Sequence, residues 1–432
     1  MKKSIQLASM FALTTLLTAC QSEESSSLDA TDQQSSLITT VQLLPPSGSD
    51  LSVKDLTASA LPPINQARDT IRFSQSIDPT LSLTAPKMTQ HQRSDQYWRT
   101  VSGAQLNAGI KLAISQSESI IRVAPRGDNS SGGLLHSPAI APEQLRLYKI
   151  NKNGIDKSAS IIHSMSDPQA MATAGIIDDS SALTLSKQAS PGQYQLQVVQ
   201  PLAAQDSYLI NVKEKGSPYQ LELDAPAALA SNNDTLKFSL AISDSDSDSD
   251  IALQPTATLK HSDGQYYPLD LVNIDQQWQA KLPEALTLPS SNRGLSEIQL
   301  DIETRIDNKP VIRTVKTAFK QYVPSATWGQ SAQIHWQQQL PVKAVLDLQI
   351  ANPGRYELSA VLVGTDANGE ARNILRSQSA LWLEQDGQVS LAFDADTIIA
   401  SGLKAPFFLQ ALELKDQGQM ARLSYLNHAA QL

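Results

Sequence analysis

Residues 298–310 have the sequence IQLDIETRIDNKP, in which apolar and charged residues alternate. Because successive side chains of a β-strand point to opposite faces, one face of this segment is apolar and the other is charged. The apolar face contains Leu300, Ile302 and Ile306, and the charged face contains Asp301, Glu303 and Arg305. The Asp-Asn-Lys-Pro sequence that follows is typical of a turn. The segment therefore predicts a half-buried antiparallel strand that ends in a tight turn.

The same alternation recurs along most of the chain after residue 91. Apolar faces with a period of two occur at Leu145 and Leu147, at Tyr194, Leu196 and Val198, at Ala257 and Leu259, and at Leu346, Leu348 and Ile350. Turn sequences separate the segments, such as Ser-Asp-Gly at 262–264 and Asn-Gly at 368–369, and residues 412–426 predict a terminal hairpin. Many short strands separated by turns indicate an all-β protein made of tandem immunoglobulin-like antiparallel β-sandwich domains.

The N-terminus has the features of a lipoprotein signal peptide. Lys2 and Lys3 precede an apolar run from Ile5 to Leu17, which is shorter than the roughly 20 residues that span a bilayer. The sequence Leu-Thr-Ala-Cys that ends at Cys20 resembles the bacterial lipobox. Residues 1–19 are therefore predicted to be removed, and Cys20, the single cysteine of the chain, is predicted to carry the lipid. An ordinary secretory signal that happens to end near a cysteine is the alternative.

This anchor predicts the location and the covalent chemistry of the mature protein. The residue after the cysteine is Gln21, not aspartate, which in enteric-type bacteria resembles the pattern for the outer membrane, so we expect a protein facing the periplasm or the cell surface. With Cys20 acylated, no thiol remains for disulfides or metal sites. The net charge of −9 is spread along the chain without a basic run, so nucleic acid is not an expected partner.

Composition divides the mature chain into four parts. Residues 21–90 are rich in Ser, Thr, Asp, Gln and Pro, which predicts a largely flexible tether, although apolar clusters at 38–44 and 71–73 could lie on the first domain. Polar joints at 213–218 and 321–326 then divide the remainder. The expected sandwich domains are 91–216, 217–323 and 324–432. Two similar segments, PGQYQLQVV at 191–199 and PGRYELSAV at 353–361, suggest that related modules occur in tandem.

Several segments together resemble a family of proteobacterial lipoproteins and secreted proteins known as a domain of unknown function. They are YWRTVSGAQLNAGIKLAIS at 97–115, IRVAP at 121–125, QWQAKL at 277–282, IRTVKTAF at 312–319 and GRYELSAVLVG at 354–364. The resemblance implies immunoglobulin-like sandwiches over most of 91–432. Its residues form strands and turns, so it implies no catalytic position.

The acidic run ISDSDSDSDI is the strongest candidate for a metal site. Its carboxylates, which an extended chain would place on one side, are Asp244, Asp246, Asp248 and Asp250. Carboxylate oxygens suit Ca²⁺, but counting from the first aspartate, the sixth and twelfth positions hold Ser249 and Pro255, where an EF-hand loop needs Gly and Glu. A solvated loop is therefore the favoured interpretation and weak cation binding the alternative. No cofactor is expected.

Catalytic motifs are weak. The six histidines (His91, His136, His163, His261, His335 and His428) lack metal-ligand spacing. The segment GQSAQ around Ser331 lacks the second glycine of a nucleophile elbow, and the S-x-x-K match at Ser401 and Lys404 has no partner motif. Loop 127–138 is glycine-rich without a following helix, so it is a candidate only for contact with a partner.

The tryptophans have two interpretations. Trp278, Trp328 and Trp336 fit core positions of sandwiches, and exposed aromatic platforms for sugars are the alternative. The leading hypothesis is a non-catalytic, membrane-anchored lipoprotein whose sandwiches bind or assemble with a protein or glycan of the cell envelope. A carbohydrate- or peptidoglycan-binding protein, and a hydrolase or accessory subunit with an unrecognised site, are the alternatives.

Overall fold

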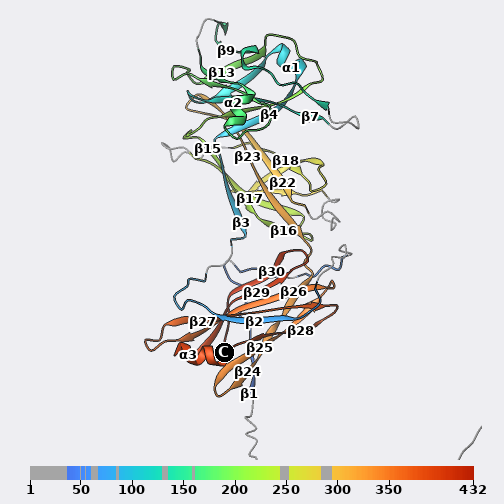
Figure 1. Ribbon diagram of the computed structural model, residues 1–432, viewed down its shortest axis with the longest axis vertical. Helices are drawn as coiled ribbons and strands as arrows, with labels where there is room; N and C mark the ends of the chain where they lie inside the picture. Colours follow the sequence, from blue (N-terminus) through green and yellow to red (C-terminus); the bar gives the residue numbers. More distant parts are fainter. Residues whose placement is uncertain are drawn as a thin grey trace, which may run out of the picture.

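The chain forms three β-sandwiches arranged end to end (Figure 1). The computed structural model describes residues 37–48, 50–53, 55–59, 67–83, 87–128, 135–157, 161–243, 253–283 and 294–432. Cys20 and the run Asp244–Asp250 lie outside these residues. Each sandwich has its own apolar core, so the all-β prediction is confirmed.

The first sandwich consists of a five-stranded and a four-stranded antiparallel sheet. The five-stranded sheet has the order β11 (Ile162–Ser166), β12 (Ser181–Leu185), β6 (Ile120–Pro125), β14 (Ser207–Lys213) and β4 (Gln96–Ser102). The other has the order β10 (Gly154–Asp156), β9 (Leu145–Asn151), β13 (Gly192–Val198) and β5 (Ile110–Ile114). Short elements complete it: α1 (Gly103–Ala108), α2 (Pro168–Thr173), the 3₁₀ helix η1 (Pro142–Gln144) and the hairpin β7 (Gly127–Asp128) and β8 (Leu135–His136).

The middle sandwich has two five-stranded sheets. One has the order β20 (Leu271–Ile274), β21 (Gln277–Lys281), β17 (Thr235–Ser243), β15 (Gln220–Pro226) and β3 (Thr89–Ser94). The other has the order β16 (Ala228–Ala230), β23 (Lys309–Tyr322), β22 (Ser296–Ile306), β18 (Thr256–Lys260) and β19 (Tyr266–Leu269), with β16 parallel to β23. The strand β3 was expected within the first domain from residue 91, but it pairs with β15 along the edge of the middle sandwich.

The C-terminal sandwich contains six strands of 11 to 13 residues. Its four-stranded sheet has the order β1 (Leu37–Gln42), β24 (Ala326–Gln337), β25 (Leu340–Ile350) and β28 (Gly387–Ala392). Its five-stranded sheet has the order β2 (Ile71–Ser76), β27 (Ala371–Leu383), β26 (Gly354–Thr365), β29 (Lys404–Asp416) and β30 (Ala421–Gln431). The helix α3 (Ala395–Ser401) follows β28.

The position of β1 and β2 corrects the prediction of a tether. The described parts of residues 37–83 run along the C-terminal sandwich, neither free of the domains nor on the first one. Leu37 pairs with Trp336, and Ile71 pairs with Ala380. Val41 also packs against the C-terminal core. Local composition misled the prediction because each of these strands is completed by partners about 300 positions away in the sequence.

Candidate functional site

Most of the candidate site residues named from the sequence do not lie together in the structure. The histidines lie on separate elements, where His91 Nδ1 is 3.0 Å from Asp224 and His261 Nδ1 is 3.1 Å from Asp263. Among the described residues, no group of three or more His, Cys, Asp or Glu side chains could hold a metal ion. No helix in the described ranges is long and apolar enough to cross a membrane.

The two serines considered as nucleophiles occupy structural positions. Ser331 lies within β24, where it pairs with Gln42 of β1. The Ser401 hydroxyl donates to the Ile398 carbonyl at 2.7 Å and accepts from the Leu403 amide at 3.2 Å. These bonds hold the hydroxyl at the C-terminal end of α3. Neither residue sits on a strand-to-helix elbow.

Three tryptophans pack as the core interpretation predicted. Trp278 packs against the middle core, and Trp328 and Trp336 pack against the C-terminal core. Trp336 Nε1 also donates to Thr39 Oγ1 at 2.8 Å, which attaches β1 to β24. These three residues therefore form no exposed platform for a sugar.

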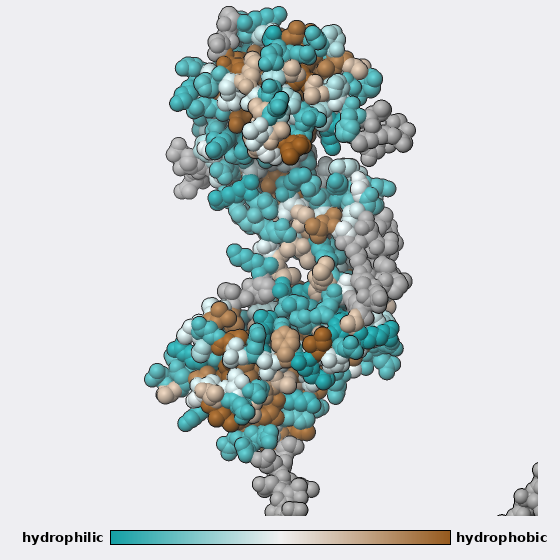
Figure 2. Space-filling view, in the orientation of Figure 1, coloured by the Kyte–Doolittle hydropathy of each residue, from teal (hydrophilic) through white to brown (hydrophobic). Residues whose placement is uncertain are grey.

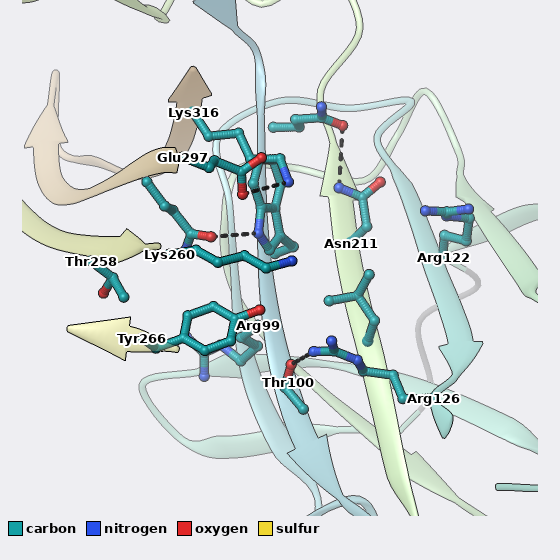
Figure 3. Close-up of a pocket in the computed structure, with 14 residues that line it drawn as sticks. Arg99, Thr100, Arg122, Arg126, Asn211, Thr258, Lys260, Tyr266, Glu297 and Lys316 are labelled. Carbon is teal, nitrogen blue, oxygen red and sulfur yellow. Dashed lines mark hydrogen bonds and ion pairs between the residues drawn. The ribbon is translucent and has the colours of Figure 1, made fainter. Parts of the chain in front are cut away.

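A groove between the first and middle sandwiches is the main candidate site, with a volume of about 620 Å³ (Figure 3). One wall is the polar outer face of β4, β14 and β6. The other wall is the polar outer face of β18, β19, β22 and β23. Both walls are regular sheets, so their side chains are held on rigid elements.

Trp98 lies where the two walls meet. Its Nε1 donates to Gln299 Oε1 across the domain boundary at 3.3 Å. Lys316 Nζ lies 5.5 Å from the centre of the Trp98 ring and 3.2 Å from Glu297 Oε1. A cation over an indole face at this distance is favourable. This cluster therefore joins the walls and places an ammonium group inside the groove.

The remaining lining is strongly cationic. Five basic side chains line the groove, against a single acidic one, Glu297; the basic ones are Arg99, Arg122, Arg126, Lys260 and Lys316. Arg122 also contacts Asp178 at 2.7 Å, outside the lining, and Arg126 Nη1 donates to Thr100 Oγ1 at 2.7 Å. At the rim, Lys260 Nζ lies 5.8 Å from the ring of Tyr266, which is 62% exposed. In a chain of net charge −9, this concentration of positive charge suits an anionic ligand.

A buried ion pair crosses the joint between the two walls. Arg313 of β23 and Glu214, at the end of β14, are both completely buried, and Arg313 Nη2 donates to Glu214 Oε2 at 2.7 Å. The same nitrogen donates to Ser217 Oγ at 2.9 Å, and Arg313 Nε donates to the Tyr219 carbonyl at 2.7 Å. On the other side of the pair, the Ser115 amide donates to Glu214 Oε1 at 2.6 Å. Residues from both sandwiches therefore satisfy one buried charge pair.

Sequence reasoning missed the groove because its cations are far apart in the chain. Arg99 and Lys316 are separated by more than 200 positions, and Arg99 shares its strand parity with the buried Tyr97 and Val101, so local alternation does not mark it as a surface cation. One predicted element does lie beside it. Arg126 directly precedes the loop 127–138 proposed as a contact site, and its carbonyl accepts from the Ser137 amide at 3.2 Å. Residues 129–134 of that loop lie outside the described part of the chain.

Comparisons with known proteins agree with the fold. The family "Domain of unknown function (DUF4785) N-terminal domain" matches residues 62–214, and "Domain of unknown function (DUF4785) C-terminal domain" matches residues 325–432. The crystal structure of a DUF4785 family protein from Legionella pneumophila subsp. pneumophila strain Philadelphia 1 is similar, with a TM-score of 0.63 and 22% sequence identity. The similarity covers 89% of this chain and 99% of that one, and at this identity it shows the fold alone. No curated protein matches the chain.

Proposed function

We propose that this member of the DUF4785 family is a lipid-anchored, non-catalytic binding protein of the bacterial cell envelope. The family description assigns no activity. The protein's lipid is carried by Cys20, and its location is the outer membrane. Its binding site is the groove between the first and middle sandwiches. The observation that carries the proposal is the excess of five basic over one acidic side chain in that groove.

The ligand class that fits best is an acidic polysaccharide. Guanidinium groups pair with carboxylate, sulfate and phosphate through two parallel hydrogen bonds, and Arg122 and Arg126 both line the wall formed by the first sandwich. The exposed ring of Tyr266 at the rim offers an apolar surface for a sugar ring. A groove between two sheets, open to solvent, also suits a linear chain that extends beyond the protein on both sides.

The experiment is a titration of a lipid-free form of the protein, residues 21–432, with three polymers of similar length. Dextran sulfate and polygalacturonate carry negative charge, and unmodified dextran is neutral. We expect both acidic polymers to bind and dextran not to bind. Binding should weaken as salt is raised from 50 to 300 mM, since salt screens exposed charges.

Variants separate the groove from the rest of the surface. The triple variant Arg122→Ala, Arg126→Ala, Lys260→Ala removes three groove cations, and we expect a loss of affinity of about tenfold or more, because exposed charge pairs contribute up to about 1 kcal/mol each. Lys111→Ala removes an exposed cation on β5, away from the groove, and should leave affinity unchanged. Equal binding of dextran, or an unaltered affinity in the triple variant, would refute this site.

The non-catalytic part of the proposal has its own test. The same purified protein is incubated with ester, peptide and glycoside substrates, including the acidic polymers that bind. We expect no turnover. Product formation that persists through purification and is lost in the triple groove variant would replace the binding protein with an enzyme.

A further inference from the structure

We infer that the C-terminal sandwich is the domain that lies on the membrane, with its apolar end in contact with the lipid surface, and that the groove is held on the far side of the protein. The inference rests on the acylation of Cys20 in the proposed function. It is carried by the place where the chain enters the folded part.

The chain enters at the free end of the C-terminal sandwich. The strand β24 runs from Ala326, next to the middle sandwich, to Gln337 at the opposite end. Because β1 is antiparallel to β24 and Leu37 pairs with Trp336, β1 begins at that opposite end (Figure 1). The first described residue therefore lies at the end of the molecule that is most remote from the first sandwich.

The segment that follows is attached to the same sandwich along much of its length. The side chain of Asn352 donates to the Thr57 carbonyl and accepts from the Ser59 amide, each at 2.7 Å. Arg355 Nη1 donates to two carbonyls of the segment, at 2.6 and 2.7 Å. Further along, β2 pairs with six residues of β27. Pulling at the N-terminus therefore loads the C-terminal sandwich, and the entry point cannot move without separating β1 from β24.

Chain lengths set the geometry. Cys20 and Leu37 are 17 positions apart, a stretch of chain that spans at most about 60 Å even when fully extended. The 12 residues of β24 rise about 40 Å from the free end to the joint. Lys316 lies six residues before the end of β23, which adds about 20 Å. The groove therefore begins about 60 Å beyond the entry point, and the first sandwich extends further.

The free end carries the side chains that a lipid surface favours. Leu37, Ile38 and Ile399 are 62%, 51% and 61% exposed. Two contacts place these residues at the same end. Leu37 pairs with Trp336, and the Trp336 ring lies 6.5 Å from the ring of Phe407. Phe407 follows shortly after α3, the helix that contains Ile399. Figure 2 shows hydrophobic residues toward the lower part of the C-terminal sandwich on this face. Exposed apolar side chains beside the attachment point of a lipid anchor fit the headgroup and acyl boundary of that membrane.

The experiment measures energy transfer from single dye labels to an acceptor in the lipid headgroups. Because Cys20 is the only cysteine and is consumed by the lipid, Gln337→Cys and Gln200→Cys each provide one labelling site, at the free end and at the far end of the first sandwich. The labelled lipoprotein is placed in vesicles of phosphatidylethanolamine and phosphatidylglycerol. We expect strong transfer from position 337 and little from position 200, which is about 100 Å away along the strands. Equal transfer, as for a molecule lying flat, or stronger transfer from position 200 would overturn the inference.

A second anchor separates this inference from the acylation of Cys20. The mature chain with Cys20→Ser and an N-terminal hexahistidine tag is bound to vesicles that contain nickel-chelating lipid. If position 337 still transfers strongly here, the orientation holds even where natural acylation fails. In either format, Leu37→Asp with Ile399→Asp should reduce transfer from position 337. Ile177→Asp, which changes an 88% exposed residue of the first sandwich, should not, and equal effects of the two changes would refute the apolar contact.

Discussion

Replacing Arg313 with methionine should destabilise the joint between the first and middle sandwiches by about 3–5 kcal/mol, the cost of leaving one partner of a buried ion pair uncompensated. Arg313 is completely buried and donates to side chains and carbonyls on both sides of the joint. Without it, the buried Glu214 carboxylate has lost its charged partner, and within the described part of the chain its remaining hydrogen-bond donors belong to Ser115. Methionine keeps much of the side-chain volume, so the loss reports the charge and its hydrogen bonds.

Scanning calorimetry of the mature chain is the assay. The first and middle sandwiches together are about 230 residues, for which 1 kcal/mol corresponds to roughly 2–4 °C, so the transition of these domains should move down by about 6–20 °C. Arg305→Met on the neighbouring strand is the matched control, because Arg305 is exposed and donates to the Asn308 carbonyl at the surface. Its effect should stay within about 0.5 kcal/mol.

The double variant Arg313→Met, Glu214→Leu removes both charges at once. Because a buried pair gains little over apolar residues of similar volume, this variant should recover most of the stability lost in Arg313→Met. A cost below about 1 kcal/mol for Arg313→Met, or equal costs for Arg313→Met and Arg305→Met, would show that the pair does not hold the joint.

Three further outcomes are expected. Cys20→Ser should leave the protein uncut or released into the soluble fraction of cells, and membrane retention of a correctly processed variant would contradict the anchor. Tyr194→Phe and Tyr356→Phe should each cost about 1–2 kcal/mol in urea unfolding, since each hydroxyl donates to a backbone carbonyl four residues upstream, at 2.6 and 2.5 Å; values near zero would contradict this. Burial, together with the nearby Asp206 carboxylate, raises the pKa of the Tyr208 hydroxyl to about 12. Because its folded-state pKa is raised, this tyrosine contributes stability below its unfolded pKa of about 10, and the contribution is lost as the pH rises toward 12. The free energy of unfolding should therefore fall between pH 10 and 12. The fall should be smaller in Tyr208→Phe.

The sandwiches were predictable because their determinants are local. In the segment from which the fold was predicted, Leu300, Ile302 and Ile306 are buried as the alternation required. The turn after them has positive φ at Asp307 and Asn308, 49° and 62°, which these residue types tolerate better than most. A period of two and a two-residue turn need no information from elsewhere in the chain.

The repeated tyrosine segments have a physical explanation that alternation alone did not give. Tyr194 and Tyr356 are buried, and each hydroxyl bonds back to the chain four residues upstream. This is the tyrosine corner of immunoglobulin-like sandwiches, which fixes the turn that precedes a strand. The similarity of residues 191–199 and 353–361 therefore reflects one structural device used in two of the three sandwiches.

The segment 37–83 and the groove could not be predicted because both depend on contacts between distant parts of the chain. Polar composition says how much apolar surface a segment can bury alone, but β1 and β2 complete sheets that other residues have already formed. Likewise, Arg122 and Lys260 are unremarkable polar positions until two separate sandwiches bring their strands together. Prediction of such a site needs the angle between domains, which no local pattern contains.

The groove and the ion pair that crosses the joint are linked through one strand. Lys316, which lines the groove, lies three residues after Arg313 on β23, about 10 Å along the strand, and the two side chains point to opposite faces. Apolar contact at the joint would stabilise many angles, whereas the hydrogen bonds that Arg313 makes across the joint, to Glu214 and Ser115, hold only a narrow range of them. Because the groove cations come from both walls, their spacing follows that angle. The double variant Arg313→Met, Glu214→Leu should therefore bind dextran sulfate less tightly even where its stability is restored, since a looser joint must be ordered when the polymer binds.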